Sequence, residues 1–245
     1  RLFDNSEVID ICRDPSTLCF CIKVKTSAGE QLFFARNLVL ATGALDIQDR
    51  LVEKMVESAT NCFEIGVRIE APSNAFGNTL STHGDLKLKL GTGRTYCVTA
   101  NGKIIAYQTG GVRFLEGCME PSISTGYTNL AVLIKCDDAK AIRDFISQYR
   151  VGFNGLPVKQ RFTDYIKGQI SSETINSTLG SAVCGDINSL LPVDINNAIE
   201  EFIRNVFVTA MDIPEDAITL VAPELKILRN LQIAKNFELD NNLFI

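Results

Sequence analysis

Residues 35–43 have the sequence Ala35-Arg36-Asn37-Leu38-Val39-Leu40-Ala41-Thr42-Gly43. The run from Leu38 to Ala41 is continuously apolar, which is typical of a strand covered on both faces in a parallel sheet. The run stops at Thr42-Gly43, and a glycine at this point lets a ligand approach the backbone closely. The stretch therefore predicts a buried strand that ends beside a ligand, although a strand ending in Thr-Gly is common by itself.

The residues before this strand predict a small antiparallel β unit over residues 6–41. Short strands are expected at residues 8–12 and 19–24, because apolar and β-branched residues gather there. Asp14-Pro15-Ser16 supplies the turn between them, and a second turn at residues 27–30 leads into the apolar run from Gln31 to Ala35.

Beyond residue 43 the pattern alternates between helix and strand. An apolar stripe over residues 47–60 predicts a helix, and the period-two alternation of residues 63–70 predicts a half-buried strand with Glu64, Arg68 and Glu70 on one face. Apolar and charged residues alternate again over residues 86–90. The strand-like segments 95–99 and 103–107 flank Asn101-Gly102, which is a strong hairpin signal.

The second half of the chain adds strands and two amphipathic helices. After a glycine-rich connection, residues 129–134 resemble a buried strand, and Asp137 or Asp138 caps a helix with an apolar face. A longer helix follows Leu191-Pro192, with Ile195, Ala198, Ile199, Phe202, Ile203 and Val206 on one side. Residues 219–221 and 226–228 are expected to form short strands. The predicted class is α+β, with an antiparallel-rich mixed sheet and packed helices.

Several segments, taken in order, resemble a family of FAD-utilising dehydrogenases of uncharacterised bacterial type. Residues 63–70 (FEIGVRIE) are similar to that family's "diGvRvE" segment, and residues 95–102 (TYCVTANG) are similar to its "tFCmCPgG" hairpin. Residues 155–164 resemble its segment with Pro, Gln and Asp. Leu190-Leu191-Pro192 and Pro223-Glu224-Leu225 fit its closing part. Thr99 and Ala100 stand where the family hairpin has its second cysteine and its proline, so a thiol pair in this hairpin is not expected.

The resemblance implies a fold in three parts. Residues 1–43 would be a remnant of an FAD-binding, Rossmann-like domain. Residues 44–222 would be an inserted α+β domain that covers the flavin and shapes the substrate pocket. Residues 223–245 would return to the FAD-binding domain. The whole protein would be an FAD-dependent oxidoreductase, and its chemistry would be hydride transfer to and from the flavin.

The resemblance also selects the candidate site residues. Thr42 and Gly43 would contact FAD, and the candidates on the substrate side are Arg68, Arg94, Cys97, Gln160 and Arg161. For Arg68 the residues themselves favour a cross-strand ion pair over contact with an anionic substrate. No G-x-G-x-x-G lies between a strand and a helix, and Gly91-Thr92-Gly93 precedes a strand. We therefore expect the chain to bind FAD weakly or not at all without the missing FAD-binding segments, and we assign no catalytic residue.

Composition excludes several classes. The net charge of -5 and the scattered basic residues give no reason to expect a nucleic-acid partner, and no apolar run is long enough to cross a membrane. The eight cysteines show no C-x-x-C spacing, so we expect no metal site, reduced thiols and a cytoplasmic location. Cys19 and Cys21 could meet on one face of a strand, but small buried hydrophobic residues are the favoured interpretation.

Two other function classes stay open at this stage. The chain could be a non-catalytic binding or assembly module without flavin. The gene sequence on either side of it would distinguish this module from the flavoprotein. Cys97 could be a nucleophile, although no base lies near it in sequence. His83, the single histidine, precedes Gly84-Asp85 and is expected to be a solvated loop residue.

Overall fold

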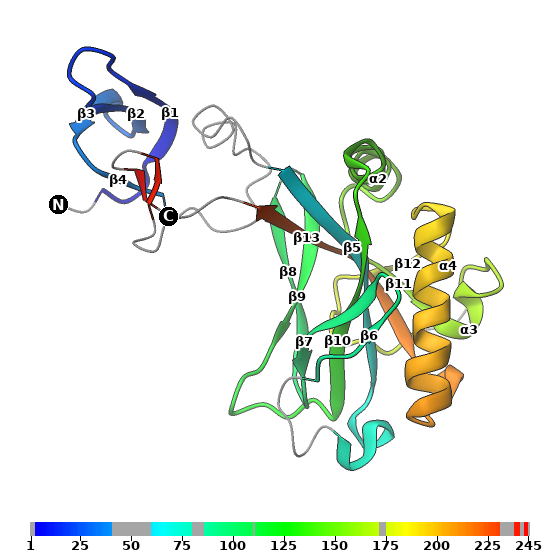
Figure 1. The fold of residues 1–245 in the computed structure, drawn as a ribbon. Coiled ribbons are helices and arrows are strands. Elements are labelled where there is room, and N and C mark those ends of the chain that lie inside the picture. The colour runs from blue at the N-terminus through cyan, green and yellow to red at the C-terminus, as the bar shows by residue number, and fades with distance from the viewer. Residues whose placement is uncertain are drawn as a thin grey trace. The chain divides into compact units, whose positions relative to one another are not determined.

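The computed structural model describes residues 3–40, 60–79, 86–109, 111–171, 175–230, 238–240 and 243–244. The chain divides into two compact units, one made of Arg1–Asn61 with Arg229–Ile245 and the other of Cys62–Leu228 (Figure 1). The helix expected over residues 47–60 lies almost wholly outside the described residues, as do His83, Thr42 and Gly43.

The first unit contains the antiparallel β unit that the sequence predicts. Its strands β1 (Glu7–Arg13), β2 (Phe20–Thr26) and β3 (Gly29–Ala35) pair in the order β1-β2-β3. The turn between β1 and β2 is closed by the amide of Leu18, which donates to the Asp14 carbonyl over 2.8 Å. Ile11, Phe20 and Val24 form the buried side of this sheet.

A second small sheet of the first unit joins two segments from opposite ends of the sequence. Its strands are β4 (Leu38–Val39), β14 (Glu238–Asp240) and β15 (Leu243–Phe244), in the order β14-β15-β4. β15 pairs with β4 in parallel, with Leu243 opposite Leu38 and Phe244 opposite Val39. Leu40 is buried, but Val39 is 66% exposed, so the expectation that this run is covered on both faces is wrong at Val39. The reason is that successive side chains of a strand point to opposite faces, and among the described residues only the face that carries Leu40 is covered.

The second unit is built on a seven-stranded mixed sheet in the order β12-β11-β13-β5-β10-β7-β6. All pairings with a described register are antiparallel except that of β11 with β12. The strands, in chain order, are β5 (Thr60–Pro72), β6 (Lys89–Leu90), β7 (Gly93–Thr99), β10 (Tyr127–Cys136), β11 (Val158–Arg161), β12 (Val183–Cys184) and β13 (Thr219–Asn230). β5 and β10 pair along their length, from Phe63 opposite Cys136 to Pro72 opposite Tyr127.

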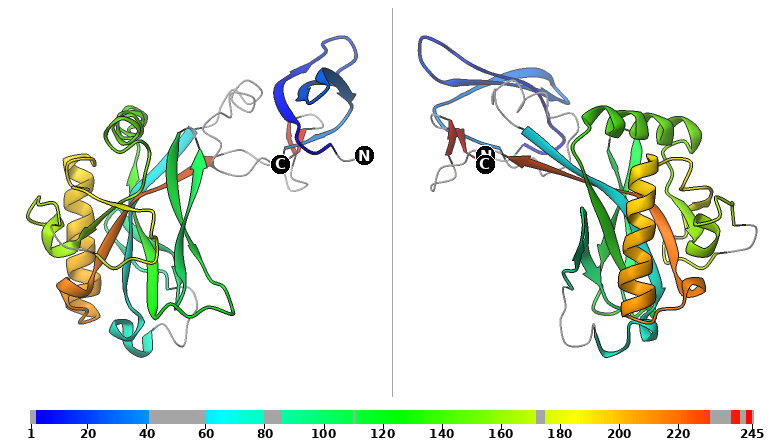
Figure 2. Two further views of the ribbon diagram at one scale, coloured as in Figure 1. Left: turned by 180° about the vertical axis from the view of Figure 1, so that it is seen from behind. Right: turned by 45° about the vertical axis from the view of Figure 1, so that its right-hand side comes forward.

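Helices cover one face of this sheet. The helix α4 (Val193–Phe202) continues into the π-helical η2 (Ile203–Ala210) and runs along the sheet (Figure 2). The helix α2 (Ala139–Gly152) and the short helices α3 (Phe162–Tyr165), η1 (Ser73–Thr79) and η3 (Glu215–Ala217) complete the unit. The core beneath the helices is formed by fully buried residues of β5 and β10 and by apolar helix residues, among them Ile65, Val67, Ile69, Val132, Phe145, Ile199, Phe202 and Phe207.

Both predicted amphipathic helices are present. The Asp138 carboxylate accepts hydrogen bonds from the amides of Lys140 and Ala141, so Asp138 is the cap of α2. The predicted stripe of the second helix faces the core, with Ile195, Ile199 and Phe202 at most 3% exposed.

Four expectations about strands need correction. Segments 95–99 and 103–107 do form strands around Asn101, but they do not form a hairpin with each other. β7 is already flanked by β10 and β6, so β8 (Lys103–Thr109) leaves the sheet and pairs with β9 (Val112–Cys118) instead. β9 was expected to belong to a glycine-rich connection.

Two further strands differ in length from the prediction. The alternation at residues 86–90 yields only the two-residue β6. The two short strands expected around Pro223 are one strand, β13, because the residues on both sides of the proline pair within the same sheet.

The observed class is mixed α+β and rich in strands, as the sequence predicts. Among the described helices, none is long and apolar enough to cross a membrane.

Candidate functional site

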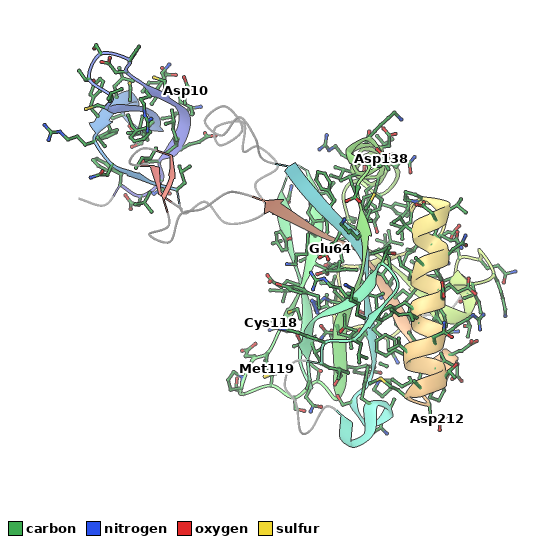
Figure 3. The ribbon with its side chains drawn as sticks, viewed as in Figure 1. Asp10, Glu64, Cys118, Met119, Asp138 and Asp212 are labelled. Carbon is green, nitrogen blue, oxygen red and sulfur yellow. The ribbon has the colours of Figure 1, made fainter. Side chains whose placement is uncertain are left out.

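The face of the sheet opposite α4 carries a group of buried charged residues. Alternation along β5 directs Ile65, Val67 and Ile69 toward the helices. Glu64, Arg68 and Glu70 therefore share the other face, as predicted (Figure 3 labels Glu64). Arg68 and Glu70 are at most 1% exposed and Glu64 is 7% exposed. Charged side chains are almost never buried to this extent unless they are paired.

Arg68 is held by three strands of the sheet. Its Nε lies 3.4 Å from Glu224 Oε2 on the neighbouring strand β13, which is the cross-strand ion pair that the sequence favours. Its Nη1 donates to Asn129 Oδ1 on β10 over 2.7 Å and to the Cys97 carbonyl on β7 over 3.2 Å. We name Arg68, Glu224, Asn129 and Tyr107 the buried polar cluster.

The β8–β9 hairpin lies directly on this cluster. A Cβ atom at Gly117 on β9 would stand 2.0 Å from Thr99 Oγ1 and 2.6 Å from Arg68 Nη1. Only glycine permits this approach of the hairpin backbone to the sheet. Tyr107 on β8 belongs to the same region, because burial raises the pKa of its hydroxyl and the Glu224 and Glu116 carboxylates raise that pKa further.

The buried polar cluster has unused hydrogen-bonding capacity. Four buried atoms have no hydrogen-bond partner among the described residues: Arg68 Nη2, Asn129 Nδ2, Glu224 Oε1 and the Tyr107 hydroxyl. Leaving such a group unpaired costs about 1–3 kcal/mol. Burial raises the pKa of the Glu224 carboxyl, while Arg68 and Lys226 act in the opposite direction. The unpaired atoms are thus two donors, one carboxylate oxygen and one hydroxyl.

A more exposed group of cations lies on the same face, where β5 begins. Arg94 on β7 donates from Nε to Glu64 Oε1 over 2.6 Å and from Nη2 to Glu64 Oε2, and the hydrogen bond with Glu64 raises the pKa of the Arg94 guanidinium. The Arg94 guanidinium also lies 5.0 Å from the Tyr96 ring centroid, and Lys226 Nζ lies 4.8 Å from the same centroid. We name Arg94, Tyr96 and Lys226 the cationic rim.

The other two substrate-side candidates lie elsewhere. Gln160 on β11 is fully buried and lies opposite Leu220 of β13, a residue of the helix-covered core. Its side-chain oxygen accepts a hydrogen bond from the Ile187 amide over 2.8 Å. It also donates to the Gln169 carbonyl over 2.8 Å. Gln160 therefore ties together two loops on the opposite face. Arg161 follows it at the end of β11, two strands away from β5.

The structure thus brings Arg68, Arg94 and Cys97 together on one face and leaves Gln160 and Arg161 apart from them. Contact of these residues with a substrate stays a prediction, as does contact of Thr42 and Gly43 with FAD. Sequence reasoning missed Asn129 and Glu224 as partners of Arg68, and it missed the influence of Glu224 on Tyr107. An available signal was a lone carboxylate and a lone amide within apolar strand segments. Among the described residues, no group of three or more His, Cys, Asp or Glu side chains could hold a metal ion.

Comparison with known proteins gives distant structural similarity. No protein-family model and no curated protein matches the sequence. The chain is similar to RebC-10x, solved in native and K252c-bound form, with a TM-score of 0.34 and 12% identity over 98% of this chain and 31% of that one. It is also similar to aklavinone-11 hydroxylase in a ternary complex with FAD and aklavinone, with a TM-score of 0.32, 14% identity and the same coverage. The chain spans about a third of the length of each.

Proposed function

We propose that this chain is part of an FAD-dependent oxidoreductase and contains the domain that covers the flavin and shapes the substrate pocket. The observation that carries the proposal is the parallel pairing of β4 with β15. Parallel neighbours require a crossover connection. Here the connection contains the whole second unit, Cys62–Leu228. This is the arrangement expected when a domain is inserted between two strands of a nucleotide-binding sheet.

The small sheet of the first unit also has room for further strands. β4 has one strand neighbour among the described residues, and the apolar side chain of Val39 is largely exposed. An open strand edge offers unpaired amides and carbonyls to another strand. We propose that the remaining FAD-binding segments of the same protein supply that strand, in keeping with the family that residues 35–43 and 63–70 resemble.

Among the described residues, the Gly91-Thr92-Gly93 motif does not have the geometry of a pyrophosphate site. Gly91 and Gly93 flank the tight turn between β6 and β7, and a Cβ atom at Gly93 would stand 2.7 Å from the Phe202 ring. This glycine therefore serves packing against α4, and no helix N-terminus follows it to receive a pyrophosphate. The flavin contacts would come from Thr42, Gly43 and the missing segments.

The substrate side would be the face that carries the cationic rim. Lys226 and Arg94 lie beside one aromatic ring, and Arg94, whose charge is paired with Glu64, keeps 30% of its side chain exposed. Such a group suits an anionic or electron-rich planar substrate. The flavin supplies redox chemistry when bound, and this domain would orient the substrate and exclude water. We propose a cytoplasmic location, on the interpretation of the cysteines as reduced thiols.

The test compares this chain with a version extended by the residues that the gene encodes on both sides. We expect the purified chain to lack flavin absorbance bands and to bind added FAD weakly or not at all. The extended protein should purify with bound flavin, which matched Arg94→Gln and Lys226→Gln variants should retain. If the unextended chain binds FAD stoichiometrically, this result would contradict the proposal that flavin binding requires the additional FAD-binding segments. Flanks without a G-x-G-x-x-G and a Gly-Glu turn would favour the non-catalytic binding module instead.

A further inference from the structure

Two cysteines of the first unit face each other across neighbouring strands. Cys12 on β1 pairs in register with Cys21 on β2, and both are free thiols. Facing residues in an antiparallel pair have Cα atoms roughly 4.5–5.5 Å apart. A disulfide spans Cα separations of about 4.4–6.8 Å. The backbone therefore already holds this pair at a distance that one S–S bond can bridge.

The side chains of the pair lie together on one face of the sheet. Facing residues of paired strands project to the same side of the sheet, and burial first, and the neighbouring Cys12 thiol second, raise the pKa of the Cys21 thiol. Cys12 is exposed and Cys21 is half-buried. Asp10 precedes Cys12 by two residues on the same strand and so shares its face. Cys12 is thus the thiol that a reagent in solution reaches first.

No other described strand register places two cysteines opposite each other. Cys118 faces Lys103, Cys136 faces Phe63, and Cys184 faces Lys159. Cys19, which the sequence suggested as a neighbour of Cys21, precedes the first residue of β2. The Cys12–Cys21 pair is therefore distinct in this part of the chain.

We infer that Cys12 and Cys21 form a redox-active dithiol that a low-molecular-weight disulfide oxidises to a cross-strand disulfide. The Cys12 thiolate attacks one sulfur of the reagent, whose S–S bond breaks and releases one thiol. The Cys21 thiolate then attacks the Cys12 sulfur of the mixed disulfide and releases the second thiol. The protein loses two electrons and two protons, and the reagent gains both as two thiols. This inference does not depend on the proposed flavin function.

The test uses the chain in buffers of defined reduced and oxidised glutathione content, followed by alkylation and tryptic mapping. Cleavage after Arg1, Arg13 and Lys23 places Cys12 in peptide 2–13 and Cys21, with Cys19, in peptide 14–23. We expect the oxidised chain to yield these two peptides joined by a disulfide, with no glutathione attached. In Cys21→Ser the joined product should disappear and Cys12 should carry glutathione.

The matched control is Cys19→Ser, which should still give the joined peptides. Two separate, fully alkylated peptides at every glutathione ratio would overturn the inference. So would wild-type protein that keeps glutathione on Cys12, because Cys21 would then fail to displace it. Loss of the joined product in Cys19→Ser would assign the bond to Cys19 and refute the proposed pair.

Discussion

Replacing Arg68 by methionine removes the positive charge at the centre of the buried polar cluster. The substitution keeps an unbranched apolar stem in the same space, so the lost guanidinium is the main change. Glu224 Oε2, Asn129 Oδ1 and the Cys97 carbonyl all lose their donor. Because Arg68 is fully buried and Glu224 is 1% exposed, water cannot replace that donor without opening the hairpin.

The expected loss of stability is large. Removing one partner of a buried ion pair costs about 3–5 kcal/mol, because the other charge stays buried without compensation. For a unit of this size, each kcal/mol lowers the melting temperature by about 2–4 °C, so Arg68→Met should lower it by about 6–20 °C. Urea unfolding followed by circular dichroism measures the free energy of unfolding directly.

The effect of Arg68→Met should also depend on pH. Burial already raises the pKa of Glu224 above its ordinary value of 4.5, and the variant loses the Arg68 charge that lowers it. A carboxyl whose pKa is higher in the folded state binds its proton more tightly when folded. Its contribution to stability is fully present below about pH 4.5 and is lost as the pH rises through the folded-state pKa. The difference in stability between wild type and Arg68→Met should therefore widen from pH 5 to pH 8.

Two further variants make this prediction refutable. The double variant Arg68→Met/Glu224→Leu should be less destabilised than Arg68→Met, because it leaves no unpaired charge. Arg204→Met removes a partly exposed arginine that pairs with Glu200 and Glu215, and it should cost about 1 kcal/mol or less. If Arg68→Met costs no more than Arg204→Met, or if the double variant is as unstable as the sum of the single variants, the buried pair is not the source of stability that we describe.

Two predictions concern local hydrogen bonds. Asp138→Ala removes the cap of α2 and should lower the free energy of unfolding by about 1 kcal/mol, whereas Asp137→Ala, which leaves the cap intact, should cost less in the same urea assay. Ser16→Ala removes the hydrogen bond of the Ser16 hydroxyl, the largest of the contacts that hold the pKa of Asp14 at about 2, and leaves the two backbone amides that also donate to Asp14, so an NMR titration should show this pKa rising part of the way toward 3.8. Because the lowered pKa stabilises the fold above about pH 3.8 and that stabilisation is lost as the pH falls through about 2, the variant should show a weaker pH dependence of stability in this range. An unchanged Asp14 pKa would assign the shift to other groups.

Sequence patterns identified most of the individual strands and helices of this protein, because the spacing of apolar residues shows which face of an element is buried. The alternation in residues 63–70 predicted both the strand β5 and the shared face of Glu64 and Arg68. The stripe after Pro192 predicted the helix that covers the sheet. The Asn101-Gly102 signal correctly marked a turn but not the pairing of the strands on either side. A turn specifies only a local reversal, while pairing depends on which strand edges are already occupied.

The sequence by itself determined the α+β class, the positions of the main strands and helices, and the resemblance that motivates the flavoprotein proposal. Only the tertiary structure decided that Arg68 pairs with Glu224, that the β8–β9 hairpin lies on that pair, and that Cys12 faces Cys21. The physical reason is that periodicity depends on neighbours within about one turn or one pleat of the chain. Strand order and register depend on contacts between segments far apart in sequence, and many alternative pairings satisfy the same local pattern.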